Sequence, residues 1–84
     1  MPTIAIIEGV RITIYLKDHL PPHLHAIFSG QEAQISIATG MVLNGSLPRA
    51  KLKAVQAWLA VNREQVSYIW REIRAGRNDG GMIE

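Results

Sequence analysis

The first half of the chain alternates apolar and polar residues with the period of a β-strand. Residues 10–16 read V-R-I-T-I-Y-L, with an apolar side chain at every second position, which is typical of a strand buried on one face. A β-branched run precedes it, and Glu8-Gly9 between the two runs suits a tight turn. We therefore predict a hairpin of two paired strands over residues 2–7 and 10–16.

A second hairpin is predicted beyond a segment that contains two consecutive prolines. Apolar positions over residues 24–28 and 33–38 indicate two strands, and Ser29-Gly30 supplies the turn that joins them. The short run 41–43 lies between two more turn signals, T-G and N-G, and predicts a small fifth strand. The expected sheet is antiparallel and has four to five short strands.

The second half of the chain changes to the three- and four-residue spacing of an amphipathic helix. Ser46 is a candidate N-cap, so a helix is expected to begin near residue 47. Asn62 followed by Gln65 resembles a capping box and predicts a second helix or a bend at that point, and Gly76 suits the C-terminal end. The apolar stripes are Leu52, Val55, Trp58 and Leu59 in the first segment and Val66, Ile69, Trp70 and Ile73 in the second.

Together these elements predict an α+β fold, in which the antiparallel sheet is followed by a C-terminal helical hairpin. The pattern shows no repeat or linker, so we expect one domain over residues 1–77 and a flexible C-terminal tail over residues 78–84. A chain of 84 residues has a small core. We therefore expect a homo-oligomer, or a complex with a small partner protein, to bury more of the surface.

The composition narrows the setting in which the protein works. The chain has no cysteine, which excludes disulfides and thiolate metal sites and fits a reducing compartment. No apolar run approaches the ~20 residues that span a bilayer, and the first residues lack the pattern of a signal peptide. We expect a cytoplasmic protein with no membrane partner.

Positive charge concentrates in the predicted helices. Residues 1–46 carry a net charge of −1 and residues 47–77 a net charge of +5, whereas the whole chain has only +2. A basic helical face is a candidate surface for nucleic-acid phosphates, although lysine and arginine are common on any solvated helix. The low total charge favours nucleic-acid contact only through an assembled complex. The candidate residues are Arg63, Arg71, Arg74 and Arg77.

All three histidines lie within seven residues, beside an aspartate and the two prolines. In a strand, His23 and His25 project from one face with Cα atoms about 7 Å apart, close enough for two imidazoles to bind one ion. His19 or Asp18 would have to fold back across the prolines to complete a metal site. The candidate metal ligands are His19, His23, His25 and Asp18, and the candidate ion is a divalent metal such as zinc.

The same histidines have two other interpretations. Two imidazoles can serve as general acid and base near neutral pH, for example in RNA cleavage. Alternatively the histidines are structural, with rings bonded to backbone at a rigid Pro-Pro corner, or they contact a partner. The pattern favours the structural interpretation, because H-x-H alone is a weak signal and no nucleophile or phosphate-loop motif accompanies it. We therefore assign no catalytic residue and no resident cofactor.

The chain resembles a small bacterial family, the domain of unknown function 4160. The shared features are an opening M-P-T-I, the string D-H-x-P-P-H-x-H-A over residues 18–26, a G-S-L-P step over residues 45–48, and a tryptophan-bearing helical end. The string is the specific part, since it fixes several residue types at set spacing. Most family members have an aromatic residue between the last two histidines, where this chain has Leu24.

The resemblance implies a partner and no mechanism. Genes of this family tend to sit beside a second small gene, of domain of unknown function 2442, in arrangements that resemble toxin–antitoxin pairs. We therefore expect a non-enzymatic protein-interaction module of such a two-gene system, which binds its partner through a sheet edge or the helical hairpin. The alternatives are a histidine-dependent, metal-assisted hydrolase or ribonuclease toxin, and a DNA-binding regulator that uses the basic helices.

Overall fold

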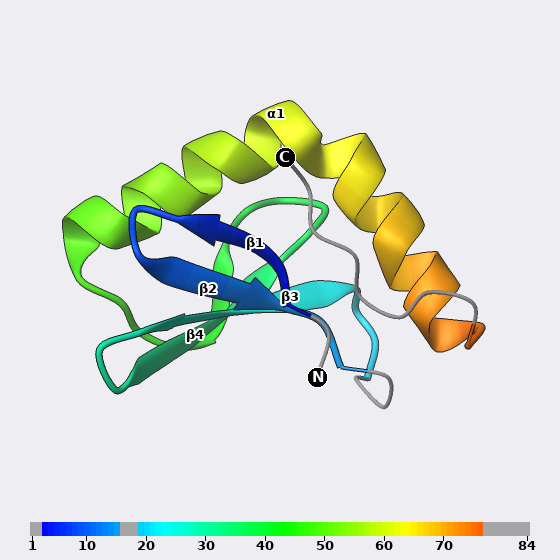
Figure 1. Ribbon diagram of the computed structural model, residues 1–84, viewed down its shortest axis with the longest axis horizontal. Helices are drawn as coiled ribbons and strands as arrows, with labels where there is room; N and C mark the ends of the chain where they lie inside the picture. The colour runs from blue at the N-terminus through cyan, green and yellow to red at the C-terminus, as the bar shows by residue number, and fades with distance from the viewer. Residues whose placement is uncertain (1–2, 16–18, 77–84) are drawn as a thin grey trace.

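A five-stranded antiparallel sheet and one long helix make up the fold (Figure 1). The computed structural model describes residues 3–15 and 19–76. The elements are β1 (Thr3–Ile7), β2 (Val10–Thr13), β3 (His23–Phe28), β4 (Gln31–Ser36), β5 (Val42–Gly45) and α1 (Arg49–Arg74). Each strand pairs with the next along the chain, in the order β1-β2-β3-β4-β5. The predicted α+β class and the antiparallel sheet are therefore confirmed.

Both predicted hairpins close through tight two-residue turns. Glu8 and Gly9 have φ values of 49° and 82°, and Ser29 and Gly30 repeat the same two values. A type I′ turn needs positive φ at both central residues, and its twist matches that of the strands it joins. The turns thus set the register of β1 against β2 and of β3 against β4.

Strand ends differ from the prediction by a few residues. β4 begins two residues before the predicted apolar run, because Gln31 and Glu32 pair with Phe28 and Ile27 up to the turn. Pairing there follows from the tight turn and not from side-chain polarity. β2 ends at Thr13, before the end of its apolar run, and the last residue of that run, Leu16, lies outside the described residues.

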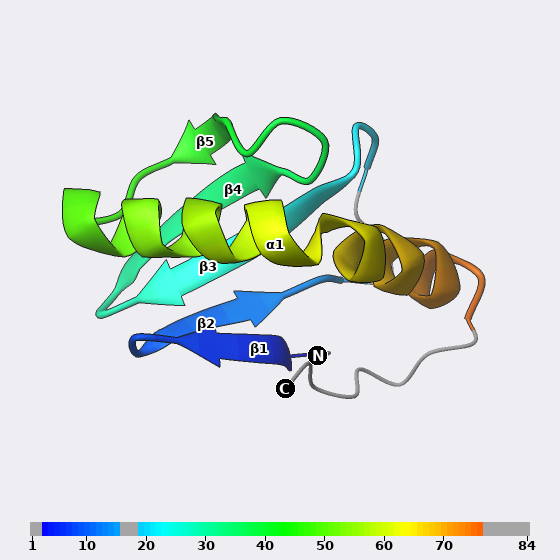
Figure 2. The same cartoon turned by 90° about the horizontal axis from the view of Figure 1, so that it is seen from above.

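The core lies between α1 and one face of the sheet (Figure 2). Leu24 of β3 and its cross-strand partner Ile35 of β4 are fully buried, as are Val55 and Leu59 of α1, and all four belong to one apolar cluster. Since successive side chains of a strand point to opposite faces, β3 residues on either side of Leu24 point away from this core. In the described part of the chain no helix is both long enough and apolar enough to cross a bilayer.

The predicted helical hairpin is wrong: the described chain ends in a single kinked helix, α1. Asn62 has non-helical dihedrals, φ −111° and ψ 15°, and its Nδ2 donates a 2.9 Å hydrogen bond back to the Trp58 carbonyl oxygen. That bond satisfies the carbonyl four residues earlier, so the helix bends and continues without a loop. The second half of α1 then curves round the end of the sheet (Figure 1) and buries its own stripe, Val66, Ile69, Trp70 and Ile73.

The helix begins differently from the prediction and ends as predicted. Ser46 does not cap α1; its N-cap is Pro48, no side chain caps it, and the Ser46 amide donates to the Glu32 carbonyl oxygen at 3.1 Å. The Ser46 amide therefore extends the backbone pairing of β5 with β4. At the other end Gly76 has φ 75° and its amide donates to Ile73 O, so the predicted helix end is confirmed. The predicted tail over residues 78–84 lies outside the described residues.

Candidate functional site

Strand β3 places two of the three histidines side by side. His23 and His25 share the face of β3 that points away from the α1 core, as their spacing predicts. Their ring centroids are 5.1 Å apart with an interplanar angle of 57°. The exposed fractions are only 7% and 6%, so this is a buried polar pair that needs hydrogen-bond partners.

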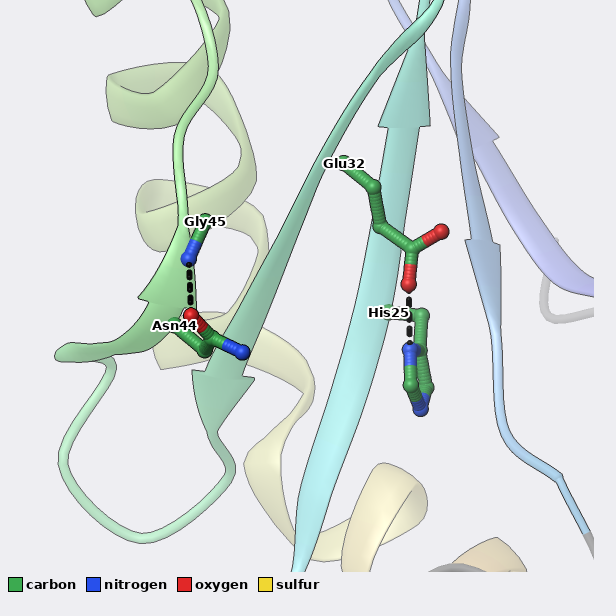
Figure 3. A network of polar contacts seen from close by, with 4 residues as sticks. All are labelled: His25, Glu32, Asn44 and Gly45. Carbon is green, nitrogen blue, oxygen red and sulfur yellow. Dashed lines mark hydrogen bonds and ion pairs between the residues drawn. The ribbon is translucent and has the colours of Figure 1, made fainter.

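Each ring is held through its Nδ1 atom by an acceptor. His25 Nδ1 donates to Glu32 Oε2 at 2.8 Å (Figure 3), and His23 Nδ1 donates to the Pro21 carbonyl oxygen at 2.9 Å. Because a carbonyl oxygen and a carboxylate only accept, Nδ1 of each ring carries the proton in these two bonds. In Figure 3 the second ring nitrogen of His25 lies on the side away from Glu32. His23 thus makes the bond to the Pro-Pro corner that the structural interpretation expects.

Aromatic side chains contact both rings. Tyr15 meets His25 edge to face, with centroids 4.6 Å apart at 75°, and Trp70 lies 5.5 Å from His23 at 51°. Trp70 belongs to the second half of α1, so the kink at Asn62 brings its ring next to His23. Packing of this kind restricts the rotamers of the two imidazoles.

A pocket of about 300 Å³ opens beside the histidines. It combines the segment before β3, the first residues of β3, one residue of β4 and one of β5. Its lining is His19, Leu20, Pro21, His23, His25, Gln34 and Leu43. The structure thus gathers all three histidines around one concave surface, which the sequence pattern left open.

The predicted four-residue metal site stays a prediction. Three of its members, His19, His23 and His25, line the pocket, whereas Asp18 lies outside the described residues. Over residues 3–15 and 19–76, no group of three or more histidine, aspartate or glutamate side chains is arranged to hold an ion. The described part of the site therefore offers a pair of imidazoles with one supporting carboxylate.

Large apolar side chains are exposed around the same pocket. Leu43 is 47% exposed and Leu20 is 70% exposed, and both line the pocket. Met41, at 65%, directly precedes β5, whereas Val42 pairs with the core residue Ile35 and so lies on the α1 face of the sheet. We name Leu20, Met41 and Leu43 the β5 surface. Exposed apolar side chains this close together are typical of an interaction surface.

Two participants in the site escaped the sequence pattern, Glu32 and Leu43. The predicted hairpin contained the signal for Glu32: a two-residue turn at Ser29-Gly30 places Glu32 opposite Ile27, diagonal to His25 on the same face. No such signal exists for Leu43, because its position beside the pocket depends on how β5 returns to pair with β4.

The candidate nucleic-acid residues do not form one group in the described structure. Arg63 Nε donates to the Ile37 carbonyl oxygen at 2.8 Å, so this guanidinium has a structural contact. Arg74 lies over the Trp70 ring at 5.4 Å, Arg71 is exposed on the last turn, and Arg77 lies outside the described residues. Nucleic-acid binding by this set stays a prediction.

Comparison with known proteins identifies one family. The model of the family described as Domain of unknown function (DUF4160) matches residues 9–71, about three quarters of the chain, and this range includes the D-H-x-P-P-H-x-H-A string and the G-S-L-P step. No curated protein and no solved structure matches the chain. The resemblance seen in the sequence is confirmed, and the chain belongs to the domain of unknown function 4160 family.

Proposed function

We propose that this protein is a non-enzymatic protein-interaction module, one half of a two-gene system of the toxin–antitoxin type. The observation that carries the proposal is the β5 surface, where exposed apolar side chains on an edge strand adjoin a pocket. The other large exposed apolar side chains of the described residues, Ile6, Val61 and Tyr68, are spread over β1 and α1. The gene neighbourhood implied by the family points to a second small protein as the occupant.

Binding at this surface would follow the chemistry of strand addition. β5 is the last strand of the sheet, so one of its backbone edges faces away from β4. An extended segment of the partner can pair with that edge while an apolar side chain enters the pocket beside Leu43 and Leu20. Main-chain hydrogen bonds then provide affinity and the pocket provides specificity.

The test is co-purification with the product of the neighbouring gene, of domain of unknown function 2442, followed by calorimetric titration. Met41→Asp and Leu43→Asp are each expected to weaken the complex at least about tenfold, because a carboxylate would be buried without a partner. Val61→Asp is the matched control: it makes the same change at an 84% exposed position on α1. Unchanged affinity in Met41→Asp, or equal loss in Val61→Asp, would contradict the proposal.

A second copy of the chain is the competing occupant of the β5 surface. Size-exclusion chromatography with light scattering on the isolated protein distinguishes the two. A monomer that combines with the partner supports the proposal. A homodimer that Met41→Asp converts to monomer would make the β5 surface a self-association interface and overturn it.

A histidine-dependent hydrolase or ribonuclease is a second candidate function, favoured by the contact between His25 and Glu32. A carboxylate that accepts a hydrogen bond from Nδ1 orients an imidazole as a general base, and His19 and His23 line the same pocket. Under this function, purified protein cleaves RNA in a chelator-free buffer and Glu32→Gln slows cleavage. Absence of cleavage in the wild-type protein, with and without added zinc, would exclude it.

A further inference from the structure

We propose that the face of the sheet that points away from α1, which we call the open face, is the interface of a symmetric dimer. In this dimer Arg11 of one copy of the chain pairs with Glu32 of the second copy. The contact lies near the turns that join β1 to β2 and β3 to β4, whereas the histidine pocket lies near the first residues of β3. The dimer goes beyond the proposed docking function and does not depend on it.

One row of side chains crosses the open face near these turns. The register pairs Ile6 of β1 with Arg11 of β2, Arg11 with Ile27 of β3, and Ile27 with Glu32 of β4. Each of the four has a chain neighbour that is buried in the α1 core, so the four side chains point away from α1. Among the described residues α1 is the only helix, and it covers the other face (Figure 2).

The row is accessible and combines apolar with charged side chains. Ile6 is 59% exposed, the side chain of Glu32 is 46% exposed, and Arg11 is also exposed, whereas Ile27 is half-buried in the middle of the row. A single exposed isoleucine is ordinary on a protein surface. Two isoleucines that alternate with two opposite charges on an uncovered face provide both an apolar and an electrostatic contact.

The two charges of the row retain bonding capacity. Arg11 has no ion-pair partner among the described residues, because Glu32 of its own chain stands two strands away, about 9.6 Å, with Ile27 between them. Glu32 accepts from His25 through Oε2, and its other carboxylate oxygen points away from His25 in Figure 3. A guanidinium and a carboxylate form a strong and specific pair when they are aligned.

A twofold axis along β3 aligns these charges between two copies. Stacked sheets lie about 10 Å apart with their strands nearly parallel to each other. Arg11 and Glu32 stand one strand to either side of Ile27. A half-turn about an axis parallel to β3 at Ile27 therefore places each Arg11 opposite the Glu32 of the other copy. The result is a closed dimer with two ion pairs around a central pair of isoleucines.

The same charges disfavour the other symmetric arrangement of the two faces. An axis perpendicular to the strands would place Arg11 opposite Arg11 and Glu32 opposite Glu32, and like charges in an interface are costly. The row thus selects a second copy in one orientation. Because part of the contact is electrostatic and solvent-exposed, we expect a dimer that dissociates on dilution and in high salt.

Sedimentation equilibrium of the full chain at several protein concentrations tests the dimer. Arg11→Glu is expected to raise the dissociation constant at least about tenfold, because both ion pairs become repulsive. Lys53→Glu is the matched control, since it reverses the same charge at an exposed position of α1 and should leave the dimer unchanged. A wild-type protein that is monomeric at every concentration, or equal dissociation of both variants, rules out this dimer.

Two milder substitutions test the ion pair without a charge reversal. Arg11→Lys keeps the charge and is expected to retain more of the dimer than Arg11→Gln, which removes it. Equal dissociation constants for Arg11→Lys and Arg11→Gln contradict a pairing with Glu32. Circular dichroism establishes that each variant is folded before its association is compared.

Mixing two variants tests the pairing of residues 11 and 32 directly. Glu32→Lys is expected to be monomeric, like Arg11→Glu, because both of its contacts across the axis join like charges. An equimolar mixture of the two folded variants should form a heterodimer, since each contact between copies again joins opposite charges. A mixture of folded variants that stays monomeric contradicts the proposed orientation.

Met41→Asp separates this dimer from the proposed docking function. It should prevent binding of the partner protein and leave the dimer intact, because Met41 lies outside the row. A dimer that fails to bind the partner removes the docking function alone, and a monomer that binds the partner removes the dimer alone. Dissociation of the dimer by Met41→Asp would place the interface at the β5 surface instead.

Discussion

Thr13 is the described residue whose polar atom is least well accommodated. It lies opposite His25 on β2, and its buried hydroxyl oxygen has no hydrogen-bond partner among the described residues. Thr13→Val keeps the shape and removes the unsatisfied group, so we expect the free energy of unfolding to rise by about 1 kcal/mol. Urea denaturation monitored by tryptophan fluorescence measures this change.

Thr39→Val is the control for that substitution. The Thr39 hydroxyl oxygen accepts a hydrogen bond from the Met41 amide at 3.1 Å, so the same change there should lower stability by about 0.5 to 1 kcal/mol. A loss of stability in Thr13→Val would show that its hydroxyl has a partner in solution.

Gly45 combines a left-handed backbone with a close contact. Its φ is 77°, and a Cβ at this position would overlap the carbonyl oxygen of Glu32 in β4. Gly45→Ala is expected to cost at least about 3 kcal/mol, since backbone strain and steric overlap add. Gly30→Ala isolates the strain, because its φ is 82° and nothing lies within 4 Å of a Cβ there.

Thermal denaturation of the two glycine variants decides which contribution dominates. We expect Gly30→Ala to lose about 1 to 2 kcal/mol and Gly45→Ala clearly more. Equal losses would mean that β5 moves away from Glu32 without cost.

At the residue scale, sequence reasoning placed the two histidines together but did not find all the groups that surround them. The spacing of His23 and His25 alone predicts that they share a face, which the structure confirms. The hydrogen bond between His25 Nδ1 and Glu32 depends on the register of β3 against β4. The position of Leu43 beside the pocket depends on a third strand, β5. The turn at Ser29-Gly30 sets the first register, but no local pattern sets the position of Leu43.

At the scale of elements, the kink in α1 depends on one side chain. Asn62 bonds back to the Trp58 carbonyl oxygen, so Asn62→Ala leaves that acceptor to water and is expected to cost about 1 kcal/mol. Gln65→Ala is the control, because a true capping box would need Gln65 and the observed backward bond does not. Equal losses of unfolding free energy in the two variants would show that Asn62 and Gln65 form a capping box after all.

The elements themselves were largely predictable, and the angle inside α1 was not. Amphipathic spacing identified both buried stripes, since each half of the helix buries one side against the sheet. The signal at Asn62 predicted a second helix or a bend, because an asparagine amide can either cap a new helix or donate to the preceding turn. The bend is the outcome, and with it the second half of α1 packs its buried stripe, including Trp70 beside His23, against the rest of the molecule.

At the scale of the whole molecule, α1 holds the loop that leads into the β5 surface. Gln56 Nε2 donates to the Gly40 carbonyl oxygen and Arg63 Nε to that of Ile37, each at 2.8 Å. Arg63→Met should therefore speed amide hydrogen exchange over residues 38–45 and weaken partner binding several-fold. Mass spectrometry of exchanged peptides measures the first effect and calorimetry the second.

Lys53→Met is the matched control for this coupling. Lys53 is an exposed residue of the same helix, so removal of its charge should change neither exchange nor affinity. If Lys53→Met has the effect of Arg63→Met, the helix influences the β5 surface through its charge and not through the loop.

Each strand after β1 pairs with the strand that was synthesised just before it. The sheet can therefore assemble while the chain is leaving the ribosome, because no strand waits for a distant segment. Its apolar face, which includes Leu24 and Ile35, stays exposed to solvent until the residues of α1 have emerged from the ribosome. During that interval chaperones and the nascent helix compete for the same face, and the speed of translation across residues 49–74 sets the time available for aggregation.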